Sequence, residues 1–135
     1  MNLEEFIKKH ATDTPITKAL GIHIIEAKNG YAKAKMEISE THSNPIGSIH
    51  GGCLFTLADV TGGTAACTHG NRVTTVDANI HYLRAGMNTS CLYGEARELK
   101  CGKNIMVYEV SLTDQDNLLL TDGIFTYMSL GKTLE

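Results

Sequence analysis

Alternating apolar and polar residues predict two antiparallel strands near the start of the chain. Residues 22–27 have a β-type composition, and in residues 31–38 Ala, Met and Ile alternate with Tyr, Lys and Glu, which is typical of a strand with one buried face. Asn29-Gly30 separates the two segments, and this pair favours a tight hairpin because both turn residues take a positive φ. Short helices are predicted before the hairpin, over residues 3–10 and 15–20.

The segment from Gly51 to about Thr68 has apolar or small residues on every side, which predicts a buried helix. A loop rich in Ser, Asn, Pro and Gly precedes it, over residues 41–49. Asp59 is the only Asp, Glu, Lys or Arg between residues 41 and 71. A charge is costly to bury, because it loses its water. We therefore expect this carboxylate to have a chemical use.

Four more strands are predicted after the helix, over residues 73–84, 90–99, 105–113 and 118–130. One face of the first is predicted to carry Val76, Ala78, Ile80 and Tyr82. The opposite face is predicted to carry Thr75, Asp77, Asn79 and His81. The order of elements indicates an α+β fold, in which an antiparallel sheet wraps around one long central helix, within a single domain over residues 1–135.

The predicted central helix needs more cover than one sheet supplies. A sheet packs against one side of a helix, so the remaining side has to meet something else. Gly62-Gly63 inside the helix costs about 1 kcal/mol per glycine relative to alanine, which indicates close backbone packing. We infer a homodimer in which a second copy covers this side of the helix, the Gly62-Gly63 side included.

Composition argues against several classes of function. The formal net charge is -3 and there is no block of Lys or Arg, so neither a nucleic-acid partner nor a membrane surface is expected. The N-terminus lacks a signal peptide's apolar run and no stretch is long and apolar enough to span a bilayer, so a cytoplasmic location is expected. We expect no metal and no cofactor, and reduced thiols at the four cysteines, which show no CxxC pair or metal-ligand spacing: Cys53, Cys67, Cys91 and Cys101.

The residues around the lone carboxylate form a motif. It consists of Asn44, Gly47, His50-Gly51-Gly52 and Leu57-Ala58-Asp59. This string resembles the phenylacetic-acid-degradation-type (PaaI-like) hotdog-fold thioesterases, and the resemblance covers most of the chain. It implies the hydrolysis of acyl-coenzyme A (acyl-CoA) thioesters by a double hotdog dimer, often paired into a tetramer. It also implies that the Gly51 N–H holds the thioester carbonyl oxygen, while His50 shapes the loop.

The resemblance gives roles to two further polar side chains. Asn44 would position the thioester or the attacking water, although an Asn before Pro45 is also a common turn former. In related sequences a Ser or Thr at about the place of Thr75 hydrogen-bonds the water or the carboxylate. Thr74 is the alternative, one residue away.

The residues themselves are suited to thioester hydrolysis. Free N–H groups at a helix N-terminus favour an oxyanion, and Gly51 and Gly52 let a thioester approach the backbone, although a tight turn would also explain them. Asp59 is the candidate general base or nucleophile. It lies eight residues from Gly51, about 12 Å along a helix, whereas reacting groups come within about 3.5 Å. We therefore expect Asp59 of one subunit to serve the oxyanion hole of the other.

The CoA phosphates need basic partners. The candidates are Arg84, Lys100 and Lys103, although each would also be expected simply as a solvated charge in a turn or at a strand end. Other functions stay open. A non-catalytic acyl-CoA-binding hotdog module would bind without releasing thiol, and a third alternative is a purely structural dimer. Hotdog hydratases and dehydratases are a further possibility, but dehydratases carry a Glu on this helix, which here has Asp59 instead. The sequence also leaves undecided which acyl group is cleaved, whether the chain forms a dimer or a tetramer, and whether Asp59 acts as a base or as a nucleophile.

Overall fold

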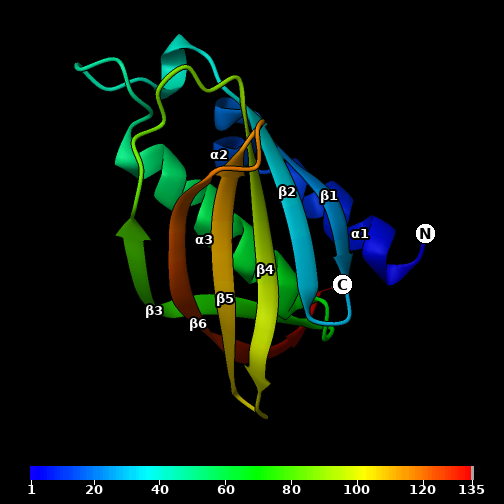
Figure 1. The fold of residues 1–135 in the computed structure, drawn as a ribbon. Helices are drawn as coiled ribbons and strands as arrows, with labels where there is room; N and C mark the ends of the chain where they lie inside the picture. The colour runs from blue at the N-terminus through cyan, green and yellow to red at the C-terminus, as the bar shows by residue number, and fades with distance from the viewer. Residues whose placement is uncertain (135) are drawn as a thin grey trace.

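Six antiparallel strands form one sheet that curves around a long helix (Figure 1). The computed structural model describes residues 1–134, so Glu135 of the predicted domain lies outside the described part. The strand order in the sheet is β1-β2-β4-β5-β6-β3. The helices and strands are α1 (Leu3–Thr12), α2 (Pro15–Leu20), β1 (Ile22–Lys28), β2 (Tyr31–Glu37), α3 (Gly51–Cys67), β3 (Asn71–Tyr82), β4 (Cys91–Cys101), β5 (Ile105–Asp114) and β6 (Leu119–Thr133). The predicted α+β fold with a sheet around a central helix is confirmed.

The first hairpin has the predicted turn. Asn29 and Gly30 have φ values of 53° and 77°, which are the positive values that the Asn-Gly pair predicts. The Gly30 N–H donates to Thr68 Oγ1 at 2.8 Å, so the tip of the hairpin is fixed to the end of α3. The alternation in β2 is also correct, because Ala32, Ala34 and Met36 are all fully buried.

Helix α3 lies in the concave face of the sheet (Figure 1). Leu57, Ala58 and Ala65 are fully buried there, and they pack in one core with the large aromatic side chains of β5 and β6. The other side of the helix is only partly covered by this chain. We call this side the open face of α3, and its exposed or partly exposed residues are Gly52, Phe55, Thr56, Asp59, Val60, Gly63 and Cys67.

Strand β3 departs from the predicted alternation. Its pairing with β6 shifts register between Thr75 and Asp77, which marks a β-bulge. A bulge adds one residue and reverses the face on which the following side chains lie. Val76 is therefore 48% exposed, and its predicted place beside Ala78 and Ile80 is wrong. Thr75 points toward α3, because the bulge separates it from the outward row that starts at Asp77.

The two glycines of α3 do not share one environment. Gly62 is buried against Tyr127 of β6, and a Cβ added at Gly62 would overlap the Tyr127 hydroxyl. The prediction that this glycine faces a second copy is therefore wrong, because its close contact is with its own sheet. Gly63 lies on the open face, where an added Cβ would make an ordinary 3.5 Å contact with the Tyr127 ring.

Candidate active site

The start of α3 presents a free backbone donor. His50 is the N-cap residue, and its Nδ1 accepts the Gly52 N–H at 2.8 Å. The N–H groups of Cys53 and Leu54 both donate to the His50 carbonyl. In residues 1–134, no protein group accepts the Gly51 N–H. Because the other first-turn donors are occupied, Gly51 carries the donor that this helix terminus can offer to a ligand.

The loop before α3 is tied together by Asn44. Its Oδ1 accepts the N–H groups of Ile46 and Ser48 at 3.1 and 3.0 Å, and its Nδ2 donates to Ser48 Oγ at 2.7 Å. The His50 N–H donates to the His42 carbonyl at 2.7 Å. In this chain Asn44 is therefore a turn-forming residue, and through the loop it helps to fix where α3 begins.

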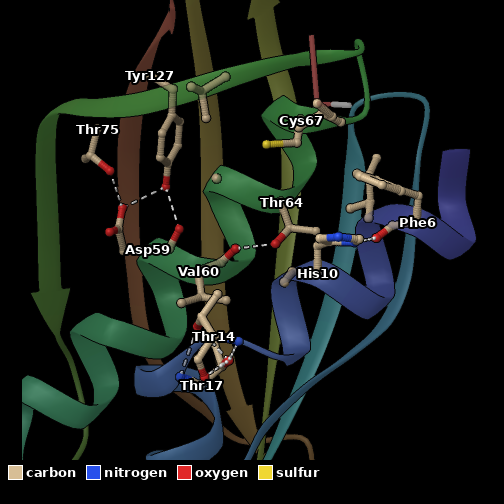
Figure 2. Close-up of a pocket in the computed structure, with 15 residues that line it drawn as sticks. Phe6, His10, Thr14, Thr17, Asp59, Val60, Thr64, Cys67, Thr75 and Tyr127 are labelled. Atoms are coloured by element: carbon tan, nitrogen blue, oxygen red, sulfur yellow. Dashed lines mark hydrogen bonds between the residues drawn. The ribbon is translucent and has the colours of Figure 1, made fainter. Parts of the chain in front are cut away.

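Asp59 is held by side chains from two strands (Figure 2). The Thr75 hydroxyl donates to Asp59 Oδ1 at 2.8 Å. The Tyr127 hydroxyl lies 3.1 Å from the same oxygen and 3.0 Å from the Asp59 backbone carbonyl. No donor within the described residues contacts Oδ2. One carboxylate oxygen is thus fixed and the other is free to meet a ligand.

Tyr127 is a site residue that the sequence reasoning missed. It is 1% exposed, and burial, followed by the neighbouring Asp59 charge, raises its pKa far above the ordinary value. The phenol therefore stays protonated and remains a donor. Phe125 and Tyr127 alternate along β6 as inward residues, so a phenol on the buried face of the last strand was the signal that could have identified it.

An apolar cavity of about 340 Å³ opens beside Asp59. It runs along the open face of α3 between α1 and β3, with Phe6, His10 and Cys67 on the side away from Thr75 (Figure 2). His10 stacks on Phe6 with ring centroids 3.9 Å apart. Burial raises the pKa of the Cys67 thiol to about 11, so this thiol is neutral at ordinary pH. The cavity suits an apolar group whose reactive end lies at Asp59.

The Gly51 end of α3 has a separate cavity of about 310 Å³. Tyr82 lines it, and its hydroxyl donates to the Gly51 carbonyl at 3.2 Å. Arg84 lines the same cavity, whereas Lys100 and Lys103 lie near the β4–β5 turn, at the far end of the sheet from the start of α3 (Figure 1). The two cavities share no lining residue. Within one chain, therefore, Gly51 and Asp59 do not face a common space.

Three exposed side chains offer metal-ligand atoms within 4.8 Å of one another: His69, Glu98 and Cys101. His69 lies just past the C-terminal end of α3, and its Nε2 contacts Glu98 Oε1. The Tyr108 hydroxyl donates to the same oxygen at 2.7 Å. Hydrogen bonds within the protein thus already occupy this carboxylate.

No helix within residues 1–134 has both the length and the apolar character to cross a bilayer.

Comparison with known proteins identifies the family. The family model described as the thioesterase superfamily matches residues 46–121. The chain belongs to the thioesterase superfamily. Acyl-coenzyme A thioesterase PaaI of Escherichia coli is 34% identical to this thioesterase over 98 residues, which are 73% of this chain and 70% of the relative. Human acyl-coenzyme A thioesterase 13 is 32% identical over 117 residues, 84% of each chain.

Solved structures agree with the fold of this thioesterase. The E. coli PaaI protein from the phenylacetic acid degradation operon has a TM-score of 0.89 at 28% identity, over 98% of this chain and 99% of that one. A hypothetical thioesterase of Streptococcus pneumoniae with coenzyme A has a TM-score of 0.78 at 26% identity, over 83% of this chain and 90% of that one. Two solved variants of a hypothetical thioesterase from that organism each carry a single replacement by alanine. One replaces an aspartate, and the other replaces a threonine 16 positions later. The predicted PaaI-like hotdog-fold thioesterase is confirmed.

Proposed function

We propose that this thioesterase hydrolyses acyl-CoA thioesters to the free acid and CoA at a site centred on Asp59. The observation that carries the proposal is the half-free carboxylate of Asp59, which lines an apolar cavity: Thr75 and Tyr127 hold Oδ1, and no donor within residues 1–134 contacts Oδ2. The names of the E. coli and human relatives support acyl-CoA as the substrate class. The 16-residue separation of Asp59 and Thr75 equals that of the two positions replaced in the S. pneumoniae variants.

Asp59 has two available routes. As a general base, Oδ2 takes a proton from water, the hydroxide attacks the thioester carbon, and the leaving thiolate takes the proton back as the C–S bond breaks. As a nucleophile, Oδ2 attacks the carbon and expels the thiolate, and water then cleaves the mixed anhydride. In both routes the Gly51 N–H stabilises the oxyanion. Asn44 and His50 hold the loop, Gly52 leaves room for the substrate, and Arg84 is the best placed of the basic residues for a CoA phosphate.

The proposed site is shared between two subunits. Gly51 and Asp59 are separated by about 12 Å of helix, which is too far for one carboxylate to reach the thioester held at the other. Two observations support sharing. The cavities at Gly51 and Asp59 have no lining residue in common, and the open face of α3 exposes Asp59 where a partner's antiparallel α3 can lie. Each dimer then has two composite sites.

The function is tested by thiol release from a panel of short, long and aryl acyl-CoAs. The Asp59→Asn variant removes the base or nucleophile and is expected to lower kcat at least ~100-fold. Asp116→Asn is the matched control, because Asp116 lies exposed in the β5–β6 turn. Full activity in Asp59→Asn would exclude the proposed role. Binding without thiol release would instead indicate a non-catalytic module, and loss of enoyl-CoA absorbance would indicate a hydratase.

The two routes differ in where oxygen from water is found. Under single turnover in oxygen-18 water, label in Asp59 arises only from the nucleophilic route, when water cleaves the anhydride at the Asp59 carbonyl carbon, whereas the general-base route puts all of the label into the released acid. Mass spectrometry of the peptide that contains Asp59 makes the distinction.

Sharing between subunits is tested by complementation. Gly51 is the first residue of α3, where proline is tolerated, so Gly51→Pro removes the free N–H with little disturbance of the helix. Gly51→Ala keeps the N–H, and its Cβ would lie 3.6 Å from the Tyr82 ring, so it is expected to lose far less activity. Mixed Asp59→Asn and Gly51→Pro subunits are expected to regain activity in heterodimers. No recovery after proven subunit exchange would exclude a shared site.

A further inference from the structure

We propose that Tyr127 is a positioning residue that selects which oxygen of Asp59 reacts. This inference rests on the proposed catalytic role of Asp59. Tyr127 and Thr75 both lie within hydrogen-bonding distance of Oδ1, from two neighbouring strands of the sheet. With Oδ1 occupied by these donors, Oδ2 is the oxygen that takes the proton or attacks the thioester.

Tyr127 contacts the main chain and the side chain of Asp59 together. Its hydroxyl lies 3.0 Å from the backbone carbonyl and 3.1 Å from Oδ1. A group that contacts both atoms restricts the side-chain rotamer as well as the position of the helix. Thr75 reaches Oδ1 alone. Tyr127 is therefore placed to set the orientation of the carboxylate, and Thr75 to complete it.

Gly62 makes this contact possible. It lies one turn after Asp59 on α3, and a side chain there would occupy the space of the Tyr127 hydroxyl. A glycine inside a helix costs about 1 kcal/mol relative to alanine. The closeness of the phenol to Asp59 thus explains a glycine that is otherwise unfavourable in this helix.

The Tyr127 hydroxyl remains a donor to Asp59 at working pH. Tyr127 itself stays protonated, because burial and the Asp59 charge raise its pKa. The other titratable side chains that line the cavity are His10 from α1 and Cys67 from α3. Removing the phenol leaves Oδ1 with the Thr75 donor alone, so the carboxylate is expected to lose its fixed orientation.

The test compares Tyr127→Phe with Tyr108→Phe. Tyr108 is also fully buried, lies on the neighbouring strand and packs edge-on against Tyr127 at 6.0 Å, but its hydroxyl donates to Glu98 at 2.7 Å. Both variants lose one buried hydroxyl, and only one of them loses a contact with Asp59. Tyr127→Phe is expected to lower kcat about 10- to 100-fold, with KM changed less than about threefold.

A double variant separates an effect on the orientation of Asp59 from an effect on folding. Tyr127→Phe added to Asp59→Asn is expected to change the residual rate less than about twofold, because Tyr127 acts through the carboxylate. Rates are expressed per folded subunit, measured by thermal unfolding. The inference is overturned if Tyr127→Phe keeps the wild-type kcat, if Tyr108→Phe loses as much, or if the effect persists in Asp59→Asn. If the wild type hydrolyses no acyl-CoA, the proposed function fails first; a failure at Tyr127 alone leaves that function intact.

Discussion

Thr75 Oγ1 donates a 2.8 Å hydrogen bond to Asp59 Oδ1, across 16 residues of sequence. The β-bulge between Thr75 and Asp77 makes this contact possible. Bulges often lie beside functional sites, where they redirect a side chain. Here the bulge gives β3 two inward segments, and Thr75 is the last residue of the first segment. The relationship connects an irregularity in the sheet with the one acidic side chain of the central helix.

Thr75→Val is expected to lower kcat about 10- to 100-fold with little change in stability, because a hydrogen bond to a charged group is worth about 1.5–3 kcal/mol. Thr75→Ser keeps the hydroxyl and is expected to retain most activity. Thr74→Val is the matched control, since Thr74 is the exposed neighbour that carries no contact with Asp59. Steady-state thiol release measures all three. A Thr74→Val loss equal to that of Thr75→Val would contradict the assignment.

Most of this site was accessible from local sequence patterns. The motif from Asn44 to Asp59 predicted the loop, the start of α3 and the carboxylate, because helix capping and burial depend on neighbouring residues. The partners of Asp59 depend on how strands far apart in the sequence pair. Thr75 was predicted from the family resemblance, but on the wrong face of its strand, since the alternation rule does not anticipate a bulge.

The fold was predictable for the same reason, and its long-range contacts were not. Asn29-Gly30 and the strict alternation in β2 determine a hairpin from adjacent residues. The environment of Gly62 depends instead on Tyr127 of β6, which lies 65 residues later in the chain. A glycine in a helix indicates a close neighbour but does not say which one. That is why the sequence suggested a second subunit where the structure has its own sheet.

The two helix glycines are expected to differ in their tolerance of alanine. Gly62→Ala forces the Tyr127 hydroxyl to move, and overpacking of this kind typically costs about 1–3 kcal/mol. In Gly63→Ala the added Cβ makes an ordinary contact at 3.5 Å, and the helix gains up to about 1 kcal/mol of propensity. Urea denaturation at fixed protein concentration measures both free energies of unfolding. Equal losses in the two variants would mean that Gly63 is also closely packed, as a partner helix at that position would require.

Cys67 is expected to make the fold sensitive to alkaline pH. Its pKa is about 11 in the folded chain because of burial, against an ordinary value of 9.0. Below pH 9 the thiol is protonated in both states and has no effect. Between about pH 9 and pH 11 the unfolded chain releases this proton while the folded chain retains it, so the free energy of unfolding falls by up to about 2–3 kcal/mol. The Cys67→Ala variant lacks the titrating thiol. The buried tyrosines, whose pKa values are also raised, contribute to the pH dependence of the wild type and of the variant alike. Urea denaturation from pH 7 to pH 11 should therefore show a smaller decline in Cys67→Ala than in the wild type, and parallel declines would show that the thiol does not contribute.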